Sequence, residues 1–267
     1  MDLLIRTLES MPLWLLGASF FVIFWLAALS GRWLRARSQP DDSKDPGLIV
    51  SASLGLLALL LGFTVSMAVA RYDGRRTATV DEANAIGTFL YRTDLMPADL
   101  RSATLDELDR YLTARITVGA QGESADAVAA AREQTGKAAA RMWSHMMEVG
   151  PRVPDTAVRI LLVQSANQMF DAASSRDAAL ANRLPGTLVV LLILFPIASL
   201  VLIGYVSDRS VGAHFMASTE LILLLTLVLL LIADLNRPRS GTILTPMGPL
   251  LDVEKQLHET RLSRPRQ

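Results

Sequence analysis

Hydrophobic and polar residues are segregated along this chain. Four stretches of 22 to 25 residues contain no Asp, Glu, Lys or Arg, apart from a single Glu in the last of them. About 20 consecutive apolar residues span a bilayer as a helix, so each stretch predicts a transmembrane helix. The predicted spans are residues 12–30, 47–70, 186–206 and 212–234.

The first span has a second interpretation. Small residues near its end, Ala27, Ala28 and Ser30, would suit the cleavage site of a signal peptide. However, the apolar run is longer than a usual signal core, and the opening MDLLIRTLES is not a basic segment. We therefore predict a membrane helix here.

The polar segment between the second and third spans is rich in Ala, Leu, Arg and Glu, which favour helices. Leu105, Leu108, Leu112 and Ile116 recur at helical spacing and predict one apolar face. The segment is therefore predicted to be a bundle of three or four helices, some of them continuous with membrane helices.

The chain accordingly divides into a helix pair (1–70), a helical cytoplasmic insert (71–184), a second helix pair (185–234) and a C-terminal tail (235–267). The predicted fold class is an all-α polytopic membrane protein with four transmembrane helices and a helical soluble insert between helices 2 and 3. Asp155, a residue type typical of helix N-caps, marks the start of the last insert helix.

Composition excludes several function classes. The chain has no cysteine, so disulfides and thiolate chemistry are ruled out, and its three histidines, His145, His214 and His258, are scattered. No nucleophile and base pattern, phosphate-binding loop or metal motif occurs. We expect no enzyme activity, no catalytic residue, no cofactor or metal, and no nucleic-acid partner.

A stripe of small residues follows the second span. Ser51, Gly55, Ala58, Gly62 and Ser66 are separated by three or four residues and therefore share one helix face. Small residues allow helix backbones to pack closely. The alternative is that the stripe lines a conduction path in an oligomer, where small and hydroxyl-bearing side chains leave room for an ion.

Basic residues mark the point where this helix leaves the bilayer. Arg71, Arg75 and Arg76 lie within about a turn and a half of the boundary. Basic residues commonly anchor helices at this level. If several copies of the helix surround an axis, however, the arginines would form a ring that attracts anions at a pore mouth.

Acidic residues follow in the same segment. Asp73 can pair with Arg76 within the helix, and the adjacent Asp81 and Glu82 form an acidic turn that needs a cation or an Arg from another helix. The three carboxylates are therefore a candidate cation or salt-bridge site.

Apart from Asp234, the last residue of the fourth span, Glu220 is the only acid inside a predicted span. Because an ionised group there costs about 3 kcal/mol or more, it is a functional candidate by default. The structural alternative is a protonated Glu that is hydrogen-bonded to a neighbouring helix. Asp234, at the end of the same span, can form a boundary ion pair with Arg237 or Arg239.

Two blocks of the sequence are similar to a known family. They are LGLLALLLGFTVSMAVARYDGRRTATVDEANAIGTFLYR (54–92) and LNRPRSGTILTPMGPL (235–250). With the insert and two spans between them, they resemble the bacterial DUF4239 family, which is also called bestrophin-like. The segment RYDGRR (71–76) is similar to the pattern that follows the pore helix of bestrophins.

The resemblance implies an architecture and an activity. Bestrophins are oligomeric, mostly pentameric, anion-selective channels whose second transmembrane helix lines the pore and continues into a cytosolic helical region. By this likeness the candidate pore-lining residues are Ser51, Gly55, Gly62, Phe63 and Ser66, with Phe63 as the nearest candidate for a constriction. Bestrophin necks contain more aromatic residues, and no acidic cluster here matches the bestrophin calcium clasp.

The predicted function is thus a homo-oligomeric, bestrophin-like channel for ions, with anions favoured. Two alternatives remain: an ion- or proton-coupled transporter that uses Glu220, and a non-transporting scaffold or sensor whose insert binds a partner. The expected partners are membrane lipid, further copies of the chain and ions.

The expected location is the bacterial inner membrane. More Arg and Lys residues lie near span ends on the side of the termini and insert than on the side of the two short loops, which predicts that termini and insert are cytoplasmic. The first helix taken alone predicts the opposite orientation.

Overall fold

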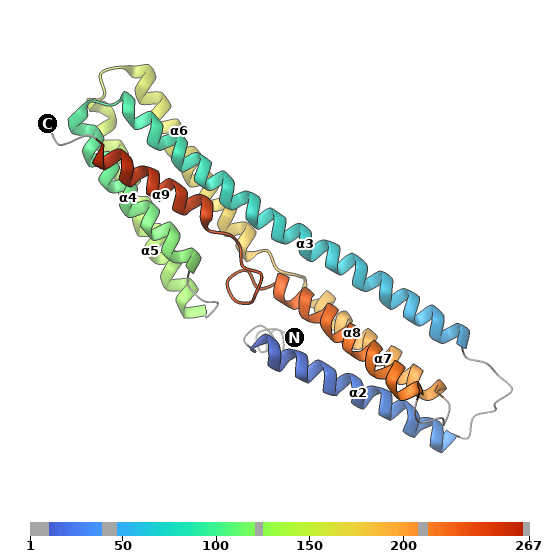
Figure 1. The fold of residues 1–267 in the computed structure, drawn as a ribbon. Helices are drawn as coiled ribbons and strands as arrows, with labels where there is room; N and C mark the ends of the chain where they lie inside the picture. The colour runs from blue at the N-terminus through green and yellow to red at the C-terminus, as the bar shows by residue number, and fades with distance from the viewer. Residues whose placement is uncertain (1–10, 39–46, 121–124, 208–212, 264–267) are drawn as a thin grey trace. The chain divides into compact units, whose positions relative to one another are not determined.

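The computed structural model describes residues 11–38, 47–120, 125–207 and 213–263, and these contain helices but no strand. The helices are α2 (Leu13–Ser38), α3 (Gly47–Arg92), α4 (Ala98–Ala120), α5 (Ala125–Val149), α6 (Thr156–Ala181), α7 (Gly186–Val206), α8 (Ala213–Leu235) and α9 (Gly248–Leu262), with short 3-10 turns at Thr93–Leu95 and Gly150–Arg152 (Figure 1).

Four helical segments are long and apolar enough to cross a membrane, and they lie in Leu13–Ser38, Gly47–Leu95, Thr156–Val206 and Met216–Leu235. The predicted fold class is therefore confirmed. The first residue of the predicted fourth span, Gly212, lies outside the described residues.

The chain forms two compact units. We call them the membrane unit (Met1–Ala70, Arg183–Arg237 and Gly241–Ile243) and the insert unit (Arg71–Asn182, Pro238–Ser240 and Leu244–Gln267). Each has its own apolar core. Helix α3 contributes residues to both units and runs without interruption, as its composition predicts.

Close packing of α2 against α7 holds the membrane unit together. A methyl group on Gly31 would lie 2.0 Å from the carbonyl oxygen of Val201, and one on Gly204 would lie 2.1 Å from that of Ala28. Only glycine permits backbones to approach this closely. Helix α3 joins α7 through a hydrogen bond of 3.0 Å between the hydroxyls of Ser53 and Ser199.

Replacing Gly204 with valine is expected to destabilise the membrane unit by about 3 kcal/mol or more, because backbone atoms cannot move aside as a side chain does. The measurement is the thermal midpoint of the detergent-solubilised protein, followed by size-exclusion chromatography. Gly55→Val is the matched control, since within the described ranges no atom lies within 4 Å of the added Cβ position at Gly55. Equal midpoints for the two variants would contradict this packing.

Helix α2 ends at Ser38, eight residues beyond the predicted end of the first span. Its last turns are stabilised by side chains. The guanidinium of Arg37 lies 3.9 Å from the ring centre of Trp33, and Nη1 of Arg35 donates to the carbonyl oxygens of Tyr205 and Val206. These carbonyls belong to the end of α7, where helix carbonyls need donors from outside the helix.

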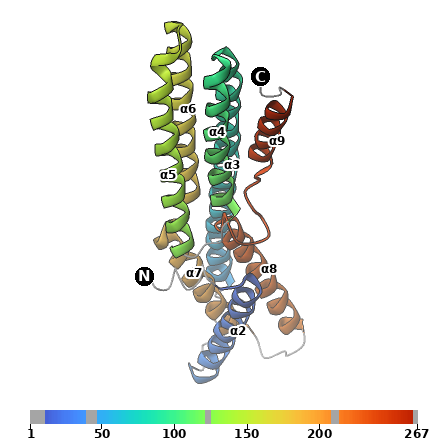
Figure 2. The same cartoon turned by 90° about the vertical axis from the view of Figure 1, so that its left-hand side faces the viewer.

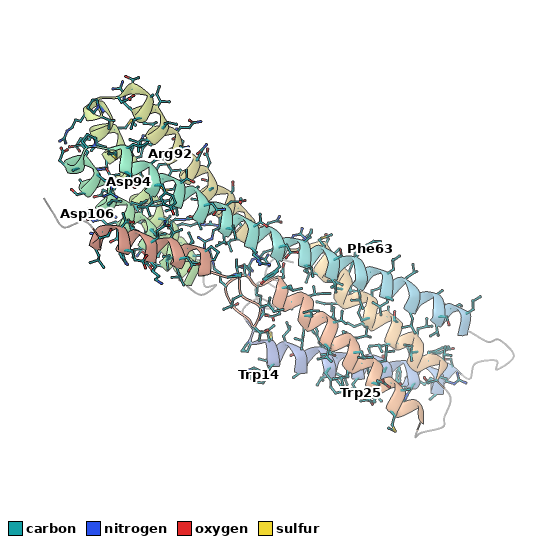
Figure 3. All side chains as sticks on the ribbon, turned by 45° about the horizontal axis from the view of Figure 1, so that its top comes forward. Trp14, Trp25, Phe63, Arg92, Asp94 and Asp106 are labelled. Carbon is teal, nitrogen blue, oxygen red and sulfur yellow. The ribbon has the colours of Figure 1, made fainter. Side chains whose placement is uncertain are left out.

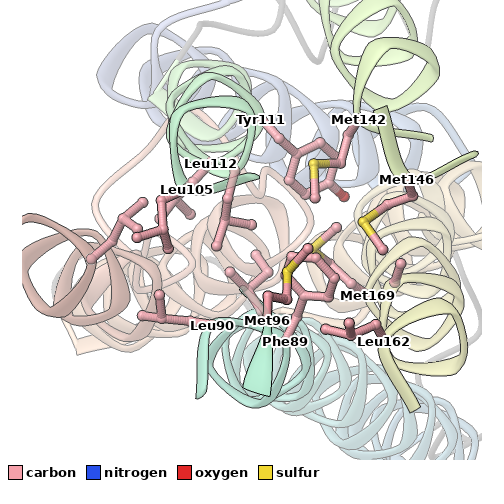
Figure 4. Close-up of a cluster of buried hydrophobic side chains, with 14 of the residues drawn as sticks. Phe89, Leu90, Met96, Leu105, Tyr111, Leu112, Met142, Met146, Leu162 and Met169 are labelled. Carbon is pink, nitrogen blue, oxygen red and sulfur yellow. The ribbon is translucent and has the colours of Figure 1, made fainter. Parts of the chain in front are cut away.

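The insert unit has a core of Leu, Met and aromatic side chains, and Figure 2 shows its long helices running alongside one another. Leu105, Leu108 and Leu112 are buried and Ile116 packs against them, which confirms the predicted apolar face of α4. Met142, Met146 and Met169 fill the space beside Tyr111, as Figure 4 shows.

Helix boundaries in the insert unit follow local chemistry. Asp155 caps α6 as predicted, and its carboxylate accepts from the backbone N–H of Ala157 at 2.7 Å and of Val158 at 3.3 Å. A short non-helical segment separates α6 from α7. It ends with Pro185, and α7 begins at Gly186. Helix α9 was not predicted from the sequence.

Candidate functional site

The membrane part of α3 has one face packed into the membrane unit and another that is exposed. The packed face carries Leu57, Leu61, Thr64 and Ala68, at steps of three and four residues. A helix turns by about 100° per residue. Gly62, five residues after Leu57, therefore points about 140° away from this face.

The exposed face contains every candidate pore-lining residue. Ser51, Gly55, Gly62 and Ser66 are exposed, and in the part of the chain that the structure describes no atom lies within 4 Å of a Cβ built on Gly55 or Gly62. Phe63 is 67% exposed and lies on the outer edge of α3 (Figure 3). Packing against other described helices of the same chain therefore does not account for this stripe.

The three arginines at the start of the insert unit have different surroundings. Arg71 is half-buried and its Nε donates to Oδ1 of Asn182 at 3.3 Å. Arg75 is 1% exposed, whereas Arg76 is exposed. The structure thus leaves Arg76, and part of Arg71, accessible to solvent.

The three candidate acids are not brought together. Asp73 and Asp81 are exposed, whereas Glu82 is fully buried. Among the described residues, no group of three or more Asp, Glu, His or Cys side chains could hold a metal ion.

Glu82 instead receives two arginines from other helices. Its Oε1 accepts from Nε of Arg115 in α4, and its Oε2 accepts from Nη1 of Arg176 in α6 at 2.9 Å. Arg115 also binds Asp177 in α6, with Nη1 and Nη2 at 3.0 and 3.1 Å from its two oxygens. Of the predicted acidic turn, Glu82 is thus paired with Arg from other helices, whereas Asp81 is exposed.

The surroundings of Arg115 favour its charged form. Burial alone would lower the pKa of Arg115, but its hydrogen bonds and charge interactions with Glu82 and Asp177 raise that pKa above its ordinary value. Beside it, burial raises the pKa of the Tyr111 hydroxyl, which therefore remains neutral. Buried charges are tolerated when they are paired and hydrogen-bonded, so the network joins α3, α4 and α6 firmly.

The sequence analysis did not identify Arg115, Arg176 or Asp177. A signal for the burial of Glu82 does exist, because Glu82 follows Leu57 by 25 residues, which brings it back to within about 20° of the same helix face. No local sequence pattern identifies the residues that pair with Glu82, since Arg115 and Arg176 lie 33 and 94 residues further along the chain.

Glu220 is exposed on α8. Leu223, Leu224 and Leu227 follow on the same exposed face, so the carboxyl group lies in an otherwise apolar surface of a candidate membrane span. The other acid of this helix, Asp234, is buried.

The boundary group at the end of α8 has a defined geometry. Oδ1 of Asp234 accepts from the backbone N–H of Thr242 at 2.9 Å, and its Oδ2 accepts from the Thr242 hydroxyl. Gly241 adopts φ +135°, and any Cβ there would meet the Asp234 carboxylate. Nη1 of Arg237 donates to the Met11 carbonyl at 2.7 Å, and Arg239 is half-buried.

The order of these helices and the sequence of the chain match a known family. A family model described as Bestrophin-like domain matches residues 18–245, which is most of the chain. The chain belongs to the bestrophin-like domain family. Among curated proteins, none matches this bestrophin-like chain.

Solved structures share the bestrophin-like fold. A bacterial bestrophin homologue from Klebsiella pneumoniae is 14% identical, with a TM-score of 0.68 over 93% of this chain and 98% of the other. A single-residue variant of that homologue is 13% identical, with a TM-score of 0.68 over 92% and 98%. A third structure, described as a membrane protein, is 14% identical, with a TM-score of 0.68 over 90% and 98%. At these identities the likeness concerns the fold alone.

Proposed function

We propose that the chain assembles as a homo-oligomeric membrane channel for ions and that α3 lines the conduction path. The observation that carries the proposal is the exposed small and hydroxyl-bearing face of the membrane part of α3, where no described residue covers Gly55 or Gly62. Ser51 and Ser66 would offer hydroxyl oxygens to a partly dehydrated ion. Phe63, which is largely exposed, would form the apolar constriction.

The permeant ion is proposed to be an anion. Copies of α3 around an axis would place Arg76 and the accessible part of Arg71 in a ring, and a ring of one charge sign concentrates ions of the other sign at a pore mouth. Arg75 is buried, so it would contribute through its field rather than by contact. Membership of the bestrophin-like family supports this function.

A second candidate is an ion- or proton-coupled transporter, and the exposure of Glu220 favours it. A carboxylate on the apolar surface of a membrane helix costs about 3 kcal/mol or more if lipid surrounds it. The group would therefore be protonated, bind a cation or contact another subunit. A coupled transporter would use the protonated state and the cation-bound state of Glu220.

Passive flux separates these functions. Purified protein in liposomes is expected to let chloride follow its own gradient, measured with an enclosed halide-sensitive dye, and Glu220→Gln should leave the flux largely unchanged. A transporter would lose flux in Glu220→Gln while its oligomer stays intact. Absence of flux from an intact oligomer would contradict both and favour a scaffold or sensor whose insert binds a partner.

We also propose the finer assignments that follow from the sequence. Within the bestrophin-like proteins the chain would be a DUF4239 member, located in the bacterial inner membrane with its termini and insert in the cytoplasm. Asp73 and Asp81 would offer exposed carboxylates on the insert to a cation or a basic side chain. Asp234 would pair with Arg237 or Arg239 and hold the end of α8 at the membrane boundary.

A further inference from the structure

Within the insert unit, α3 has one buried face and one exposed face. The buried face carries Arg75, Thr79 and Glu82. A helix turns by about 100° per residue. Arg76 therefore lies about 100° to one side of Arg75, and Asp81, six residues after Arg75, lies about 120° to the other side. The exposed face of α3 is thus bordered by a positive flank at Arg76 and a negative flank at Asp81.

The described part of the chain provides no ion-pair partner for either of these charges. Arg76 and Asp81 are both exposed, and neither forms an ion pair with another described residue. They cannot pair with each other along α3, because residues five apart point about 140° away from each other. Both charges therefore remain available to another molecule.

We propose that Arg76 of one copy pairs with Asp81 of the next copy around a ring of identical chains. This pairing depends on the proposed function, in which copies of α3 surround a conduction path. A ring of identical copies is closed by contacts between two different surfaces of the same chain. The Arg76 flank of each α3 then faces the Asp81 flank of the next, and the charges are complementary at every contact.

The geometry of α3 permits this contact. Asp81 lies about 7.5 Å further along the helix axis than Arg76. The long side chain of arginine and a modest tilt between packed helices bring this offset within reach. Gly74 lies on the same flank as Asp81, and no described atom lies within 4 Å of a Cβ built on it, so a neighbouring helix can approach closely there.

The pairing is compatible with anion attraction at the pore mouth. The segment 71–76 contains three arginines and one aspartate, so the pairing of Arg76 with Asp81 leaves two arginines against one aspartate in each copy. A guanidinium bound to one carboxylate also keeps further N–H donors. The ring therefore retains an excess of positive charge.

The test is reversal of each charge in the full chain, with mass photometry of the detergent-solubilised oligomer across a dilution series. Asp81→Arg makes both flanks positive, and Arg76→Asp makes both negative. Each variant should dissociate at a protein concentration about tenfold or more above that of the unaltered protein, because like charges then face each other. Glu133→Arg and Lys137→Asp, the same charge changes at an exposed pair on α5, should not shift the dissociation.

A mixture of the two variants shows whether the pair joins separate copies. Asp81→Arg and Arg76→Asp chains with different affinity tags are co-expressed, and oligomers that carry both tags are isolated. Each contact between unlike chains then joins opposite charges. The mixed oligomer should therefore dissociate at a concentration several-fold lower than either variant alone, which a pair within one chain could not produce.

Three outcomes would overturn the proposal. One is that neither reversal shifts dissociation more than its control on α5. Another is an effect of one reversal without the other, as expected if Arg76 contacts lipid headgroups. The third is a mixture that dissociates as easily as the separate variants. Each leaves the channel function standing if chloride flux is present, whereas absence of flux from a stable oligomer contradicts that function alone, and a monomeric unaltered protein contradicts both.

Discussion

Replacing Gly62 with tryptophan is expected to reduce ion flux through the assembled protein by about tenfold or more, since a barrier raised by only about 1.4 kcal/mol already slows passage tenfold. Gly62 lies on the exposed face of α3, and none of the described residues has an atom within 4 Å of its added Cβ. The indole can therefore be accommodated without disturbing the fold of a single chain. In a ring of subunits it would project into the path, and the liposome flux assay measures the loss.

The matched control is Leu26→Trp, because Leu26 is 59% exposed on α2 and lies outside the proposed path. It should conduct like the unaltered protein. If Gly62→Trp forms an oligomer of normal size and also conducts normally, α3 does not line the path.

A smaller substitution at the same position also tests the exposed face of α3. The chain has no cysteine, so Gly62→Cys introduces a single thiol and a much smaller side chain. We expect this variant to conduct until a methanethiosulfonate reagent modifies it, and then to lose flux. Leu26→Cys should react without effect on flux.

Replacing Glu82 with glutamine is expected to destabilise the insert unit by about 3 to 5 kcal/mol, because removal of one partner leaves buried charges uncompensated. Glu82 is fully buried and is the only acid in contact with both Arg115 and Arg176 in the described chain. The variant would keep the shape of the side chain but lose its charge. Arg115 would still be paired with Asp177, but Arg176 would lose its ion pair with residue 82.

The measurement is urea unfolding followed by the fluorescence of Trp143, with the other three tryptophans replaced by phenylalanine. Trp143 lies in α5, 6.3 Å from the ring of Phe170, and therefore reports on the insert unit. Glu133→Gln is the control, since Glu133 forms an exposed pair with Lys137 in the same unit, and it should change stability little.

A double variant tests whether the effect comes from the network. Adding Arg176→Met to Glu82→Gln removes the charge that loses its ion pair with Glu82 in the first change, so the combined loss should be smaller than the sum of the two single losses. Strict additivity, or a Glu82→Gln variant as stable as Glu133→Gln, would show that the network does not hold the unit together.

Local patterns in the sequence determined the membrane helices and the two faces of α3. The charge-free stretches specify four membrane helices because backbone polar groups in lipid must be satisfied within a helix. The spacing in α3 also separates two faces, and it places Gly55 and Gly62 on the exposed one. The same spacing places Arg75 and Glu82 on the buried face, so the burial of both could have been predicted from their register alone.

Contacts between helices were decided only by the tertiary structure. Arg115 and Arg176 meet Glu82, and Gly31 meets α7, because of how each helix is rotated and offset against its neighbours. A repeat of 3.6 residues fixes which side chains share a face but not which faces meet. The ion network and the glycine contact therefore emerge from packing, whereas the helices and the exposed stripe of α3 are already present in the sequence.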